Sequence, residues 1–121
     1  MIDPDNMHSP SRLTAIRTVA DAVTVVRLEG EIDHHTAPRL RQALSADRAD
    51  GPARMVIDLD GVAFMDSSGL NALIDLHQAV QDASGWVRLA GIQQPVQRLL
   101  ELSGLQAFFD CYPTLRRALA A

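Results

Sequence analysis

The chain contains no lysine, a single cysteine and few aromatic side chains. All eleven basic residues among its 121 are arginine, so the lysine-containing phosphate loop of nucleotide hydrolases is absent. One cysteine, Cys111, excludes an intrachain disulfide and a multi-thiolate zinc site. Aromatic residues make up 4%, too few for the stacking platforms that bind single-stranded nucleic acid. The net charge of -4 and the scattered arginines predict no nucleic-acid partner and no anionic membrane partner.

Long hydrophobic runs are also missing. No stretch approaches the roughly 20 apolar residues that a membrane-spanning helix needs. The N-terminal residues are polar and include Pro4 and Pro10, unlike the basic and apolar regions of a secretory signal peptide. We therefore expect a cytoplasmic protein without a membrane partner. The length predicts one folded domain over residues 13–121, preceded by a flexible tail over residues 1–12.

The apolar pattern predicts an α/β domain. β-branched and apolar runs indicate strands at 13–19 and 23–28, paired as a hairpin, at 55–59 and 87–90, and at Phe108–Phe109. Apolar residues at helical spacing predict helices that begin near Thr36, where the side chain caps the helix, and near Ser68, Pro95 and Pro113. Because strands alternate with helices, we expect a mixed, partly parallel central sheet of about four to five strands with about four helices.

Glycine-containing turns are expected to end several of these elements. The expected stops are Gly30 after the second strand, Asp50-Gly51-Pro52 before the third, Gly85 in a left-handed conformation, and Ser103-Gly104.

The turn Asp66-Ser67-Ser68-Gly69 precedes the longest predicted helix. The first N–H groups of a helix lack internal acceptors, and the helix dipole places partial positive charge there. A phosphate on a serine in this turn would add about -1.5 to -2 charge, which a helix N-terminus tolerates. A partner surface fitted to a neutral hydroxyl would not, so the turn is suited to a phosphorylation switch. On these four residues alone, an ordinary helix cap is the simpler interpretation.

Several segments, in order and spacing, resemble the STAS-domain anti-sigma factor antagonists from about residue 13 to the C-terminus. They are Gly30-Glu31-Ile32-Asp33-His34-His35-Thr36-Ala37, Val56–Leu59, Phe64–Leu70, and Pro95–Leu100 with Leu102–Leu105. The Asp-His-His-Thr-Ala and Met-Asp-Ser-Ser-Gly-Leu stretches are most similar to the sporulation-type member. The resemblance implies a single STAS-like domain.

The resemblance also implies a partner-switching cycle. The unphosphorylated antagonist binds an anti-sigma factor that is also a serine kinase, and so releases a sigma factor. The kinase phosphorylates Ser67, with Ser68 as the alternative acceptor, and a PP2C-type phosphatase removes the phosphate. We expect no cofactor, although the sequence leaves nucleotide binding open. The implied partner surface comprises Asp33, His34, His35, Thr36, Asp66, Ser67, Ser68, Gly69, Leu70 and Asn71.

Simpler roles compete for some of these residues. Asp33 fits a turn or the start of a helix equally well. Adjacent histidines seldom point the same way, and no matching histidine–carboxylate helix motif accompanies His34 and His35, so solvated histidines rather than a metal site are expected. Asn71 departs from the resemblance, because many family members carry a second small residue there. Its side chain could alter the fit to a kinase, although exposed helix surface is the simpler interpretation.

Two other functions compete with the switch. A nucleophilic serine in a strand–helix turn needs the pattern Gly-x-Ser-x-Gly, but Met65 and Asp66 lie two residues before Ser67 and Ser68. His77 falls within the same helix, poorly placed as a distant general base. We therefore expect no enzyme. STAS domains also occur in sulfate transporters, stress-sensing assemblies and lipid-transport complexes, and a subunit of one of the latter two is the alternative.

Overall fold

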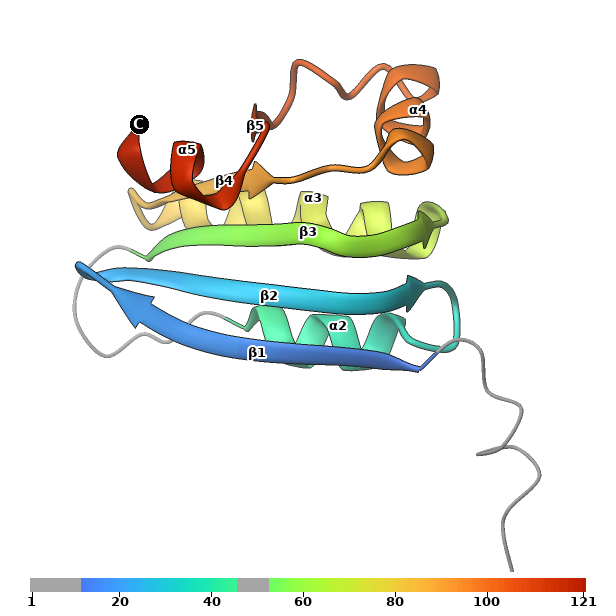
Figure 1. The fold of residues 1–121 in the computed structure, drawn as a ribbon, viewed down its shortest axis with the longest axis horizontal. Helices are drawn as coiled ribbons and strands as arrows, with labels where there is room; N and C mark the ends of the chain where they lie inside the picture. Colours follow the sequence, from blue (N-terminus) through green and yellow to red (C-terminus); the bar gives the residue numbers. More distant parts are fainter. Residues whose placement is uncertain (1–11, 46–52) are drawn as a thin grey trace, which may run out of the picture.

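The computed structural model describes residues 12–45 and 53–121. These residues form a five-stranded sheet whose order in space is the order in the chain (Figure 1). Its strands are β1 (Leu13–Ala20), β2 (Val23–Ile32), β3 (Arg54–Met65), β4 (Trp86–Ala90) and β5 (Asp110–Tyr112). β1 and β2 are antiparallel and the other three pairs are parallel. The predicted hairpin and mixed sheet are confirmed. The predicted tail, apart from Arg12, and the turn at 50–52 lie outside the described residues.

Four helices accompany the sheet in the described residues: α2 (Ala37–Leu44), α3 (Ser67–Asp82), α4 (Gln94–Leu102) and α5 (Leu115–Ala120). Parallel neighbours need crossover connections. α2 and α3 supply the first two on one face of the sheet (Figure 1), and the segment that contains α4 connects β4 to β5. α5 lies on the opposite face, and α4 lies beyond the end of β4. Within the described parts of the chain, no helix is long and apolar enough to cross a membrane.

The main core lies between the sheet and the pair α2 and α3. Alternate side chains of a strand point to opposite faces, and β3 directs Met55, Ile57 and Leu59 into this core, each at most 1% exposed. On the other face, Val56 packs beside Ala118 of α5 in a smaller cluster. The sequence of β3 is nearly continuously apolar because both of its faces are covered along this part.

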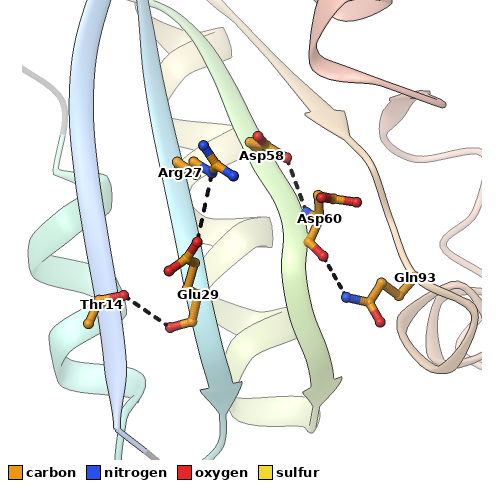
Figure 2. A network of polar contacts seen from close by, with 6 residues as sticks. All are labelled: Thr14, Arg27, Glu29, Asp58, Asp60 and Gln93. Carbon is orange, nitrogen blue, oxygen red and sulfur yellow. Dashed lines mark hydrogen bonds and ion pairs between the residues drawn. The ribbon is translucent and has the colours of Figure 1, made fainter.

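Polar side chains occupy the face opposite α2 and α3 where α5 does not reach (Figure 2). Arg27 and Glu29 of β2 form an ion pair at 4.0 Å. On β3, the Asp58 carboxylate accepts a hydrogen bond from the backbone N–H of Asp60 at 3.1 Å. The side chain of Gln93 donates to the carbonyl of Asp60. This part of the sheet is therefore polar: the Arg27 and Glu29 side chains are about half exposed, whereas Asp58 is buried.

Three predicted boundaries are wrong. Gly30 does not end β2: it lies within the strand at φ 120°, where the register with β3 shifts, and a Cβ there would lie 2.2 Å from the carbonyl oxygen of Arg12. After α3 the left-handed residue is Ser84 at φ 63°, whereas Gly85 allows close approach to the carbonyl of Ala53. The last strand begins at Asp110, because the two preceding phenylalanines pack with a histidine of α3 instead.

Candidate functional site

The turn after β3 is built around Asp66. Its Oδ1 accepts a hydrogen bond from the backbone N–H of Ser68 at 2.8 Å, so Asp66 caps α3, and its own N–H donates to the carbonyl of Ile32 at 3.0 Å. Ser67 is the first residue of α3 and is exposed, whereas Ser68 is half-buried. The helix cap and the exposed serine are thus different residues. Within the described residues, the Ser67 hydroxyl makes no hydrogen bond.

Gly69 and Leu70 set the start of α3 against the sheet. A Cβ on Gly69 would lie 2.4 Å from Cγ2 of Ile32 and 2.7 Å from Cγ of Met65. These two residues are the paired ends of β2 and β3. Leu70 is buried in the main core. The absence of a side chain at Gly69 therefore brings Ser67 close to the carboxyl ends of both strands.

The loop after β2 is closed by its own hydrogen bonds. The Thr36 hydroxyl donates to the carbonyl of Glu31 and accepts from the N–H of Asp33, both at 2.9 Å. Thr36 directly precedes α2, as predicted, but its side chain does not cap that helix because the hydroxyl is turned back to the strand. Thr36 is only 7% exposed. Its hydrogen bonds are therefore shielded from water, which strengthens them and stabilises the conformation of the loop.

Asp33 serves as the turn residue that leads into α2. Its Oδ1 accepts from the N–H groups of His35 at 2.9 Å and Thr36 at 3.0 Å. Its backbone carbonyl accepts from Ala37 at 2.9 Å. The sequence left two roles open for Asp33, a turn residue and a residue of the partner surface, and these hydrogen bonds show the first.

The loop and the serine turn meet in one shallow hollow of about 380 Å³. Its lining includes His34 from the loop and Ser68 and exposed Asn71 from α3. His35 is exposed, with its ring centroid 5.6 Å from that of His34. Residues that are more than thirty positions apart in the chain are thus neighbours at this end of the sheet.

A charged pair that was not predicted borders the same hollow. Arg41 of α2 lines it and donates to Asp75 of α3 at 2.8 Å. Both side chains are about half exposed or more. Arg41 lies one helical turn after Ala37, and Asp75 lies one turn after Asn71. Helical spacing could therefore have placed each charged residue on the same helix face as a residue of the predicted site. The sequence did not show that the two helices are adjacent.

The structure separates Ser67 from His77, and the described residues contain no cluster of metal ligands. Ser67 and His77 are ten positions apart within α3, which places them about 15 Å apart along the helix axis. The His77 ring instead packs against Phe108, with a centroid distance of 4.4 Å. Among the residues that the structure describes, no group of three or more His, Cys, Asp or Glu is placed to hold a metal ion.

Comparison with known proteins agrees with this architecture. Residues 15–118 match the family model for the STAS domain. The chain is 34% identical over 91 residues to the anti-sigma F factor antagonist of Paenibacillus polymyxa, covering 74% of this chain and 78% of that protein. It is 30% identical over 89 residues to the anti-sigma-B factor antagonist of Staphylococcus aureus, covering 74% and 82%. A crystal structure of an anti-sigma factor antagonist from Mycobacterium paratuberculosis superposes with a TM-score of 0.80 at 36% identity, covering 99% and 97%. The chain therefore belongs to the STAS-domain family.

Proposed function

We propose that the chain is a non-enzymatic anti-sigma factor antagonist that is switched by phosphorylation of Ser67. With a free hydroxyl it binds an anti-sigma factor that is also a serine kinase, so that a sigma factor is released in the cytoplasm. Phosphorylation ends this binding, and a PP2C-type phosphatase restores it. The names of the relatives support the class of partner. The observation that carries the switch is the exposed Ser67 at the first position of α3, beside the hydrogen-bonded loop at Asp33.

The two serines differ in what phosphorylation would cost. Ser68 is half-buried in the hollow beside His34, and its N–H is bonded to the Asp66 carboxylate. A kinase reaches Ser67 without disturbing any hydrogen bond of its side chain. Accessibility therefore favours Ser67 as the acceptor and leaves Ser68 as the alternative.

Electrostatics explains why the modification would affect the partner more than the fold. A negative group at a helix N-terminus is favourable by about 0.3–1 kcal/mol, so α3 tolerates a phosphate at its first residue. The phosphate adds about -1.5 to -2 charge at pH 7. The Asp66 carboxylate is already adjacent, so a partner that fits the neutral hydroxyl meets a strongly negative surface after modification.

The test is phosphorylation by the cognate anti-sigma factor with ATP. Mass spectrometry should locate the phosphate on Ser67 in the native chain and in Ser68→Ala, and find none in Ser67→Ala. Ser67→Ala should bind the anti-sigma factor with or without ATP. Ser67→Glu should bind at least about tenfold more weakly, because it places a negative charge where the partner fits a neutral hydroxyl.

Two results would contradict the proposal. One is an unmodified Ser67 after incubation with a kinase that modifies Ser68. The other is recovery from native cells of stress-complex or lipid-transport subunits in place of an ATP-binding kinase, which would favour the alternative assembly.

A further inference from the structure

We propose that the outer edge of β1 pairs with the same edge of a second copy of this chain, so that two sheets join into one across a two-fold axis. β1 lies at one end of the strand order, and among the described residues no other strand pairs with its outer side (Figure 1). A free edge presents unpaired backbone N–H and C=O groups, which can form hydrogen bonds with an extended strand that fits.

The two edges of the sheet differ in how they are protected against such pairing. β5, at the other edge, has only three residues, one of which is the charged Asp110. β1 has eight residues, which contain no proline and pair with β2 without a bulge. Its only charged side chain, Arg17, is held against the end of α2, where it donates to the carbonyls of Ala43 and Ser45 at 2.9 and 2.8 Å. β1 therefore lacks the features that keep edge strands from pairing.

Two large apolar side chains of β1 are highly exposed. Val19 is 74% exposed and Ile16 is 56% exposed. They point to opposite faces of the sheet, because successive side chains of a strand alternate between the faces and these two are three positions apart. A partner that covers one face of β1 would leave one of them in water, whereas a strand added at the edge contacts both.

The sequence of β1 is complementary to itself in one register. Directly opposite residues of an antiparallel pair share a face of the sheet. A two-fold axis at Ile16 therefore places this residue opposite its own copy, and it places Val19 opposite Leu13. Arg17 then lies opposite Ala15. An axis at Arg17 would instead place two arginines opposite each other, which is unfavourable, so we assign Ile16 to the centre of the contact.

Sedimentation equilibrium of the native chain measures the association. One pair of strands makes a small contact, which belongs to the weak class of interfaces, so we expect a dissociation constant between about 10 µM and 1 mM. Ile16→Lys should weaken the dimer at least about tenfold, because two lysines would face each other. Val19→Lys, which replaces the contact with Leu13, should also weaken it. Leu102→Lys changes an 81% exposed leucine of α4 and should dimerise like the native chain.

Cross-linking tests the register. Opposite Cα atoms of an antiparallel pair lie about 4.5–5.5 Å apart, which a disulfide can span. On a Cys111→Ser background, which removes the native thiol, Ile16→Cys should therefore form a disulfide-linked dimer on oxidation. Thr18→Cys is the matched control on the same exposed strand. It would lie about 14 Å from its own copy, four residues along the strand, and should not link.

Four results would each overturn the proposal. One is a chain that remains monomeric at about 1 mM. The second is equal weakening of the dimer by Leu102→Lys and Ile16→Lys, and the third is equal cross-linking of Ile16→Cys and Thr18→Cys, since both indicate non-specific association. The fourth is slow hydrogen exchange, independent of protein concentration, at the β1 amides that do not bond to β2, because another part of the same chain would then cover the edge. Ser67 takes no part in the contact.

Discussion

The two faces of the sheet differ in how much apolar side-chain surface they leave exposed to solvent. Toward α2 and α3, β3 buries Ile57 and its apolar neighbours completely. On the opposite face, Ile16 of β1 is 56% exposed and lies beside the exposed Arg27 of β2. Burial energy scales with the apolar area removed from water, so one face supplies most of the stability. The other face and the two ends of the sheet are then free to carry binding surfaces.

Paired isoleucine truncations test this difference most strongly. Ile57→Ala should lower the free energy of unfolding by about 2–5 kcal/mol because it leaves a cavity in a closed core. Ile16→Ala should change it by no more than about 0.5 kcal/mol, as is usual for surface substitutions. Urea denaturation measures both values. Equal losses would remove the distinction between the two faces.

The start of α3 should show an intermediate effect. Gly69→Ala should destabilise the protein by about 1–3 kcal/mol, since its methyl group has to displace Ile32 or Met65. Asn71→Ala on the exposed side of the same helix should instead be neutral or stabilise it by a few tenths of a kcal/mol, because alanine is the better helix former. Thermal unfolding compares the two. A Gly69→Ala variant as stable as the native chain would show that Ile32 and Met65 can move aside at little cost in free energy.

The charged pair beside the hollow should show the smallest effect. Asp75→Asn breaks an exposed ion pair and should cost about 0.2–1 kcal/mol. The loss should be larger at low salt, because ions screen exposed charges. Urea denaturation at two salt concentrations provides the measurement. A loss above about 2 kcal/mol in the free energy of unfolding would contradict this prediction, because it would mean that the ion pair contributes as much as a buried core contact.

The sequence predicted the secondary-structure elements correctly where the local pattern of apolar residues determines them. The β-branched run at Val23–Leu28 and the leucine spacing of α3 each predicted the correct element. Predictions failed where a tertiary contact reassigns a residue. Gly30 looked like a stop but sits at a shift of register, and Phe108–Phe109 looked like a strand but forms an aromatic cluster with His77.

The candidate site was predicted in part. The family resemblance brought the loop at Asp33 and the turn at Ser67 to the same place, and the structure puts His34 and Ser68 around one hollow. Arg41 was not predicted as part of the site, because its position there depends on how α2 and α3 pack together. The polar role of Thr36 also escaped, since a capping threonine and one turned back to a strand have the same sequence.

The agreement between strand order and chain order has a consequence for synthesis. As the chain leaves the ribosome, β1 and β2 can pair as a hairpin while the rest is still being made. Each later strand then joins an edge that already exists, and none has to insert between two strands that are already paired. The growing chain thus exposes one unfinished edge at a time, which limits the unpaired backbone available for aggregation.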